Sequence, residues 1–237
     1  MKKTLLLVTT ISALSFAMIG CSASITTNTT KPANSASNAP ANSASNAAAN
    51  SATAPKKVEA PKTALKDEKK PEGIKEKKVK NVPVPESWID IYDEQKGYGF
   101  SVPDGTTGGQ QSSNGVDVFA ATTPAPNEIA IFVLAYKNEK LTKEDLLKDA
   151  VKFLEALGVK ATPGELKGES DDYAVADCTT VSKEGLKEKQ RILVATDVSD
   201  NYVMILNTPE DKFAANEKTI EEIWGSFEMW SGGASNN

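Results

Sequence analysis

The distribution of aromatic residues along this chain limits where a folded domain can form. After Phe16, no aromatic residue occurs before Trp88, and the segment between them consists mainly of Ala, Ser, Asn, Thr, Pro, Lys and Glu. Such a segment cannot bury enough apolar surface to offset the conformational entropy that ordering removes. We therefore predict a disordered stalk over residues 21–82, a globular domain over residues 83–231 and a flexible tail over residues 232–237.

Residues 1–20 have the layout of a secretory signal peptide. Two lysines precede an apolar run, and the small residue Gly20 follows it, directly before Cys21. The sequence Met-Ile-Gly-Cys at residues 18–21 resembles a bacterial lipobox. The resemblance implies that the signal is cleaved between Gly20 and Cys21. It also implies that the Cys21 thiol carries diacylglycerol, with fatty acids such as palmitate, and that this lipid is the membrane attachment.

Two other interpretations of this N-terminus remain open. An ordinary cleaved signal would make the cysteine incidental, but such signals end in a small-x-small pattern, and Met18 is large. A transmembrane helix needs about 20 predominantly apolar residues. The apolar run is shorter and contains Thr and Ser. Ser22 after the cysteine resembles the outer-membrane sorting pattern. We expect the outer membrane in a cell with two membranes, and otherwise the outer face of the cell membrane.

Charge divides the chain into a basic stalk and an acidic domain. Residues 56–80 contain 10 lysines and 5 acidic residues, whereas residues 81–237 contain 27 acidic and 14 basic residues. The stalk lysines either contact anionic headgroups or wall polymer, or only keep the stalk soluble and extended. The acidic domain argues against nucleic acid binding, which requires a basic surface.

Cys178 is the only other cysteine, so a lipid on Cys21 leaves it without a disulfide partner. It lies in an alternating run at residues 173–178 that is typical of a strand. A free cysteine packs as a small hydrophobic residue, and a reactive thiol needs cationic neighbours that this segment lacks. We predict a buried, unreactive thiol.

The periodicity of the domain predicts strands, a helix, further strands and a last helix. Thr142 begins the first helix, whose apolar residues run from Leu147 to Leu157, and Gly158 ends it. Thr208 is the expected N-cap of the last helix, with Pro209 in its first turn. This order suggests an α+β fold with an antiparallel sheet covered by helices. The expected strands lie at residues 88–92, 98–102, 116–120, 129–134, 164–168, 173–181, 190–196 and 202–206, and a Gly-, Gln- and Ser-rich loop at residues 106–114.

Two short motifs resemble the PsbP-like family. They are Gly-Tyr-Gly-Phe-Ser-Val-Pro at residues 97–103 and Ile-Trp-Gly-Ser-Phe at residues 223–227. The family includes the photosystem subunit PsbP and DcrB-like envelope lipoproteins, and the resemblance covers residues 88–230. It implies a central antiparallel sheet packed between helices, an α/β/α sandwich. It also implies a non-enzymatic role in assembly, stabilisation or partner binding, with no active site to transfer.

The sequence contains no histidine, which excludes Ser-His-Asp and Cys-His catalysis and every histidine-ligated metal site. Phosphate-binding and dinucleotide-binding glycine motifs are also missing. Two acidic clusters could in principle do acid–base chemistry or hold calcium weakly, but solvated turns account for them better. We predict no catalytic residue, cofactor or metal, and no enzymatic activity. The clusters are Asp90, Asp93 and Glu94, and Glu169, Asp171 and Asp172.

Three functional hypotheses follow. The first is a lipid-tethered binding or assembly module that meets an envelope protein on its sheet or on the loop at residues 106–114. The second is a small-molecule or metal-binding envelope lipoprotein, a carrier or sensor. The third is a hydrolase that uses carboxylates alone. Co-purification of a partner, a ligand-dependent melting shift and turnover, respectively, would distinguish them.

Overall fold

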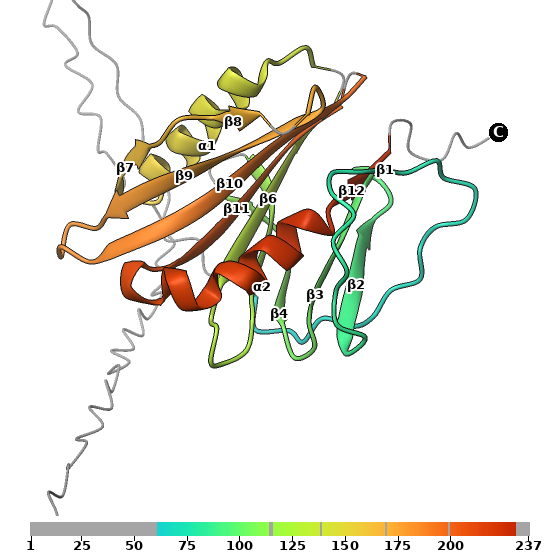
Figure 1. The fold of residues 1–237 in the computed structure, drawn as a ribbon, viewed down its shortest axis with the longest axis horizontal. Coiled ribbons are helices and arrows are strands. Elements are labelled where there is room, and N and C mark those ends of the chain that lie inside the picture. Colours follow the sequence, from blue (N-terminus) through green and yellow to red (C-terminus); the bar gives the residue numbers. More distant parts are fainter. Residues whose placement is uncertain (1–60, 114–115, 138, 169, 199, 231–237) are drawn as a thin grey trace, which may run out of the picture. The chain divides into compact units, whose positions relative to one another are not determined.

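The structure, a computed structural model, describes residues 61–113, 116–137, 139–168, 170–198 and 200–230. They form an α+β fold of two antiparallel sheets and two α-helices (Figure 1). This architecture confirms the predicted fold class. The structure also contains a second sheet, which the sequence analysis did not predict. The predicted signal peptide, its cleavage site and the first part of the predicted stalk lie outside the described residues.

The elements follow in this order along the chain: β1 (Lys77–Lys78), β2 (Trp88–Asp93), β3 (Tyr98–Pro103), β4 (Thr107–Ser113), β5 (Val116–Thr122), β6 (Ala130–Tyr136), α1 (Lys143–Ala156), β7 (Lys160–Pro163), β8 (Lys167–Gly168), β9 (Tyr173–Val181), β10 (Lys187–Asp197), β11 (Asp200–Pro209), a 3-10 helix (Glu210–Lys212), α2 (Phe213–Gly225) and β12 (Glu228–Met229).

The large sheet has the strand order β4-β5-β6-β11-β10-β9-β7, and β8 also pairs with β9. Its strand pairs are antiparallel. Since successive side chains of a strand point to opposite faces, each face has its own apolar cluster. In β10, Ile192 and Val194 belong to the cluster under α1, whereas Leu193 and Ala195 belong to the cluster under α2. The sheet therefore lies between the two helices, as predicted.

One face of the large sheet is covered by α1, and local sequence explains this helix. The Thr142 hydroxyl accepts from the Asp145 N–H, and the Asp145 carboxylate accepts from the Thr142 N–H, which is a capping box. The predicted start is confirmed. The buried positions are Leu146, Ala150, Phe153 and Leu154, so the buried face is turned slightly from the predicted one.

The other face is covered by α2 and by the small sheet, whose strand order is β1-β12-β3-β2. The centre of this core is aromatic. The Phe227 ring lies 5.9 Å from the Tyr98 ring and 5.7 Å from the Tyr202 ring, measured between centroids. Gly97 has a φ of +71°, and a Cβ atom there would lie 2.5 Å from the Trp230 carbonyl oxygen, so this tight turn requires glycine. The "GYGF" and "SF" motifs are therefore turn and core residues of the small sheet.

Residues 61–82 differ from the prediction of a disordered stalk, because they pack against the domain. We call this segment the N-terminal strap. It follows the edge of β4, where the Leu65 N–H donates to the Thr106 carbonyl (2.9 Å) and the Gly108 N–H donates to the Thr63 carbonyl (2.8 Å). Edge strands carry unpaired backbone groups, and the strap satisfies some of them.

The strap then crosses β2 and the end of α2. The Glu68 N–H donates to the Asp90 carbonyl (2.9 Å), and the Val79 N–H donates to the Phe227 carbonyl (2.9 Å). Val79 is 5% exposed and belongs to the aromatic core. The strap was missed because its few apolar contact residues lie far apart among lysines, so no local periodicity marks them.

The predicted loop at residues 106–114 is wrong, because the chain there forms β4, which pairs with β5 over its whole length. Glycine, glutamine and serine suggest a loop, but long-range pairing overrides this weak local preference. Gly108 has a specific reason to be glycine. A Cβ atom there would lie 2.5 Å from the Ala120 carbonyl oxygen of β5, so the close approach of this strand leaves no room for a side chain.

The predicted capping role of Thr208 is also wrong. Strand β11 continues through Thr208, which pairs with Lys189 of β10. The Thr208 hydroxyl accepts from the Asn216 side-chain amide at 2.9 Å and is fully buried. The helix begins later, at Phe213, after a 3-10 turn, and its N-cap has no side-chain hydrogen bond.

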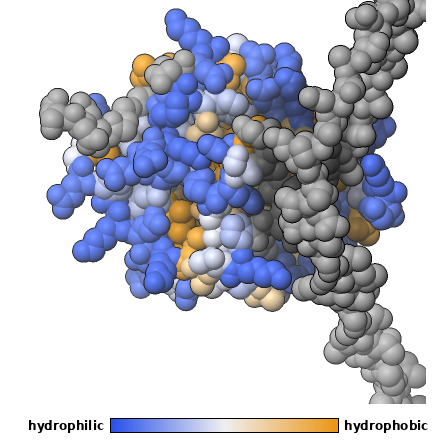
Figure 2. Space-filling view, turned by 180° about the vertical axis from the view of Figure 1, so that it is seen from behind, coloured by the Kyte–Doolittle hydropathy of each residue, from blue (hydrophilic) through white to orange (hydrophobic). Residues whose placement is uncertain are grey.

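Cys178 is 1% exposed and free, which confirms the predicted buried thiol. Burial raises the pKa of this thiol, so the protonated, unreactive form is favoured. In the described part of the chain, no helix combines the length and apolarity needed to cross a membrane. On the side seen in Figure 2, hydrophilic side chains predominate and hydrophobic ones form only narrow patches.

Candidate functional site

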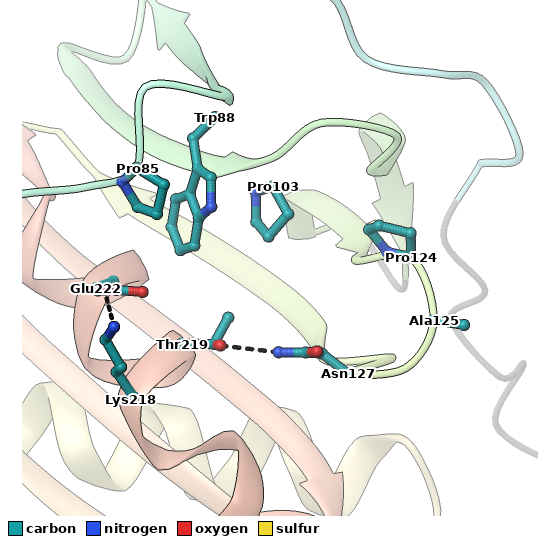
Figure 3. Close-up of a pocket in the computed structure, with 9 residues that line it drawn as sticks. All are labelled: Pro85, Trp88, Pro103, Pro124, Ala125, Asn127, Lys218, Thr219 and Glu222. Carbon is teal, nitrogen blue, oxygen red and sulfur yellow. Dashed lines mark hydrogen bonds and ion pairs between the residues drawn. The ribbon is translucent and has the colours of Figure 1, made fainter.

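A groove of about 300 Å³ lies beside α2, where three loops meet the helix (Figure 3). We call it the Trp88 groove. Its lining comes from the segment before β2, the end of β3, the β5–β6 loop and α2. The lining residues are Pro85, Trp88, Pro103, Pro124, Ala125, Asn127, Lys218, Thr219 and Glu222.

The apolar wall of the groove is built around Trp88, which is half-buried. Its backbone N–H donates to the Pro85 carbonyl (3.0 Å), and Trp88 pairs with Pro103 across β2 and β3. Proline fixes its own φ and favours an extended residue before it, so this wall loses little conformational freedom when a ligand binds. Trp88 presents a flat ring edged by rigid pyrrolidine rings.

The opposite wall is polar and is tied to α2. The Asn127 side-chain amide donates to the Thr219 hydroxyl at 2.8 Å, and the Asn216 side-chain amide donates to the backbone carbonyl of Asn127 at 2.9 Å. Lys218 and Glu222 form an ion pair at 3.6 Å, drawn with the Asn127–Thr219 bond in Figure 3. The two hydrogen bonds of Asn127 hold the β5–β6 loop against the helix, whereas the ion pair lies within α2.

The side chains of this lining are of the kinds that bind a ligand. An aromatic ring, prolines and an alanine offer apolar contact, and an amide, a hydroxyl and one ion pair offer orientation. Ligand sites commonly combine these features: apolar walls with a few placed polar groups. Among the described residues, no group of three His, Cys, Asp or Glu side chains is arranged to hold a metal ion.

The acidic clusters singled out from the sequence do not line the groove, and three of their carboxylates accept hydrogen bonds or form an ion pair within the fold. Asp90 accepts from a serine hydroxyl of β3 at 2.6 Å, and Asp93 accepts from a glutamine amide of β4 at 2.7 Å. Asp172 forms an ion pair of 2.5 Å with Lys77 of the strap. Glu169 lies outside the described residues. These carboxylates therefore stabilise edges and turns.

The predicted lipid attachment site, Cys21, and the cleavage site after Gly20 lie outside the described residues and stay predictions. The Trp88 groove was not predicted. Its residues come from four segments that are up to 137 positions apart, Pro85 to Glu222, and each segment has an ordinary local role as strand start, turn or helix. Only the prolines clustered before Trp88 hinted that this tryptophan is partly exposed.

Comparison with known proteins gives structural similarity only. No known family matches the sequence, and no curated protein matches it. The structure is similar to cyanobacterial PsbP (CyanoP) from Synechocystis sp. PCC 6803, with 17% identity over 63% of this chain and 96% of that chain, and a TM-score of 0.49. It is also similar to the Ran-binding protein Mog1p of Saccharomyces cerevisiae, with 11% identity over 59% of this chain and 94% of that chain, and a TM-score of 0.44.

A third similar structure is LpqN of Mycobacterium tuberculosis, a protein involved in cell envelope biogenesis. It is 16% identical over 66% of this chain and 92% of that chain, with a TM-score of 0.29. All three TM-scores lie below 0.5, so the function proposed below rests on the chain itself. Membership of the PsbP-like family stays a prediction from the two motifs.

Proposed function

We propose that this protein is a lipid-anchored, non-enzymatic binding or assembly module of the bacterial cell envelope, which holds a partner protein in the Trp88 groove. One observation carries the proposal: a half-buried tryptophan stands between prolines on a wall whose polar side is fixed by the Asn127–Thr219 bond. Tryptophans in preformed apolar pockets are among the residues that contribute most to protein interfaces.

The groove fits an extended, partly apolar segment of the partner. Aromatic-lined grooves bind proline-rich extended segments, because these segments already hold the polyproline II conformation and lose little entropy on binding. The Lys218–Glu222 pair stands at the polar wall, where Lys218 is 87% exposed and Glu222 12% exposed. Lys218 can therefore turn toward an acidic group of the partner without burying its charge.

The lipid anchor is the second half of the proposal. The lipobox resemblance at residues 18–21 supports attachment through Cys21, on the outer membrane or on the outer face of the cell membrane. Several acyl chains on one cysteine hold a protein firmly, since each buried CH₂ group contributes about 0.8 kcal/mol. The anchor confines the domain to the membrane surface, where its partner would be found.

The test is crosslinking in cells followed by mass spectrometry, with three variants beside the wild type. Trp88→Ala removes the ring of the groove. Tyr136→Ala is the matched control, because Tyr136 is also a half-buried aromatic but packs on the α1 face. Cys21→Ala removes the proposed anchor. Thermal unfolding of each purified variant establishes that it is folded.

A protein that crosslinks to the wild type and to Tyr136→Ala, but not to Trp88→Ala, is the expected result. A partner that stays bound to Trp88→Ala would exclude the groove as the docking site. Loss of membrane attachment in Cys21→Ala, together with acylated Cys21 in the wild type, tests the anchor separately. If no protein crosslinks but a small molecule raises the melting temperature of the wild type alone, the groove belongs to a carrier or sensor.

A further inference from the structure

The β9–β10 turn carries an unusually exposed leucine. Leu186 is 67% exposed and Val181, at the end of β9, is 36% exposed. Only two other large aliphatic side chains of the described residues are exposed, Val116 and Val198. Figure 1 shows this turn at the far end of the large sheet, beyond α2. We call residues 181–187 the hairpin tip.

The tip is an ordered turn. The Ser182 hydroxyl accepts from the N–H groups of Glu184 and Leu186, both at 3.2 Å. The Ser182 N–H donates to the Leu186 carbonyl at 2.9 Å, and Gly185 supplies the φ of +81° that the turn needs. The backbone of Leu186 is therefore held from both sides, and its side chain stays outside the core.

Three exposed lysines lie in the turn or next to these aliphatic residues in the sheet. Strand pairing places Lys160 of β7 and Lys187 of β10 on either side of Val181, on one face of the sheet. Lys183 lies in the turn itself. None of the three takes part in an ion pair with any residue that the structure describes. Their charges are thus available to an external partner.

The tip is positive although the domain as a whole is acidic. Lys160, Lys183 and Lys187 stand against Glu184 and Glu188, so the local net charge is +1. Lys189 adds nothing to this sum, because it pairs with Asp177 at 3.6 Å. The opposite end of β10 provides the contrast. Val198 is 93% exposed there, but its acidic neighbours Asp197 and Asp200 pair with Lys77 and Lys137, so no lysine is left unpaired by them.

We infer that the hairpin tip is a second, direct contact of the domain with an anionic phospholipid surface. Leu186 and Val181 would enter the boundary between headgroups and acyl chains, and Lys160, Lys183 and Lys187 would meet lipid phosphates. Aliphatic side chains with lysines beside them suit this interface, because long lysine chains keep their ammonium groups among the headgroups. A neutral surface offers these lysines nothing, so anionic lipid is required.

This contact goes beyond the proposed anchor and groove and does not depend on either. It would orient the domain on the membrane, whereas a lipid at the N-terminus only holds it nearby. The tip and the Trp88 groove share no residue. Either one can therefore fail in experiment while the other holds.

The test uses the full chain in vesicles, with an environment-sensitive dye on Leu186→Cys or, as the matched control, on Val198→Cys. Cys178 is buried and does not take the dye. Cys21 could take it if it carries no lipid, so a parallel pair with Cys21→Ala shows that the signal comes from the introduced cysteine. Phosphatidylcholine vesicles are compared with phosphatidylcholine–phosphatidylglycerol vesicles, each with brominated acyl chains that quench dye in the apolar layer. We expect a blue shift and quenching at residue 186 in anionic vesicles only, and no response at residue 198 in either.

Removal of the lysine charges makes the test more specific. Each lysine removed from the tip should weaken the response about fivefold, and added salt should weaken it further. A dye at residue 186 that stays in water in both vesicles would overturn the proposal. So would equal responses at both positions, or a response that needs an added envelope protein instead of anionic lipid. Attachment to neutral vesicles and the mass of Cys21 report separately on the anchor.

Discussion

The two faces of the large sheet are covered in different ways. One face is closed by α1, a capped helix of 14 residues, and by residues close to it in the sequence, such as Leu141, Val159 and Leu166. The other is closed by α2, the small sheet and the strap, which come from both ends of the domain. Local sequence suffices for the first cover, whereas the second needs distant segments to meet. The second face should therefore respond more strongly when one of its central residues is removed.

The largest expected effect compares two phenylalanines. Phe227 is fully buried, and its ring lies within 6.3 Å of three other rings. Among the aromatic rings of the described residues, Phe153 pairs with Phe132 alone, at 5.5 Å. Phe→Ala in a core costs about 3–5 kcal/mol. We expect Phe227→Ala to lie near the upper end in urea unfolding and Phe153→Ala near the lower end. Equal losses would contradict the difference between the faces.

A smaller effect is expected where the strap crosses α2. A Cβ on Gly225 would lie 2.6 Å from the Val82 side chain. Gly225→Ala should therefore lower the free energy of unfolding by about 1–2 kcal/mol, the usual cost of overpacking. In a Val82→Ala background the same change should cost less, because the 2.6 Å contact with Val82 Cγ2 is gone and only the 3.1 Å contact with Val82 Cβ remains.

The double-mutant cycle measures the contact between strap and helix directly. A coupling energy near zero would mean that residues 80–82 do not rest on α2 in solution. That result would instead support the disordered stalk that the composition of this segment predicts.

The α1 face offers a local test of similar kind. Thr142→Ala removes the capping box, and loss of a cap costs about 1 kcal/mol. Hydrogen exchange should become faster in the first turn of α1 and stay unchanged in α2. Thr142→Ser keeps the hydroxyl and serves as the control. Faster exchange across both helices would show that the two faces are not independent.

The smallest expected effect concerns pH and the strap. Burial by itself lowers the pKa of Lys70, but hydrogen bonds and attraction to Glu228 and Glu76 outweigh it, so the pKa is raised from 10.5. A raised lysine pKa stabilises the folded state below pH 10.5, and this contribution is lost as the pH rises through the folded value. We expect limited proteolysis of the strap to increase above pH 10.5.

Lys70→Met separates this effect from other alkaline titrations. Burial also raises the pKa of Tyr98 and Tyr202, so both lose stability contributions above about pH 10 in either protein. Only the additional opening of the strap should disappear in Lys70→Met. Identical pH profiles for the two proteins would exclude Lys70 as the group that holds the strap.

Sequence reasoning succeeded where one short segment carries enough information. The capping box at Thr142 and the alternation around Cys178 predicted a helix start and a buried strand that the structure confirms. It failed at β4 and Thr208, where pairing with a neighbouring strand outweighs composition. The Trp88 groove could not be predicted from any single segment, because its lining residues come from four segments that lie far apart in the sequence.

By itself, the sequence determined that the aromatic residues of the domain begin at Trp88, that histidine chemistry is excluded, and that Lys143–Ala156 is helical. These follow from composition and from contacts within about one helical turn. Only the tertiary structure decided that the strap closes the second core and that the Trp88 groove exists. Both depend on contacts between residues far apart in sequence. Their free energy comes from burial and strand pairing that no local pattern records.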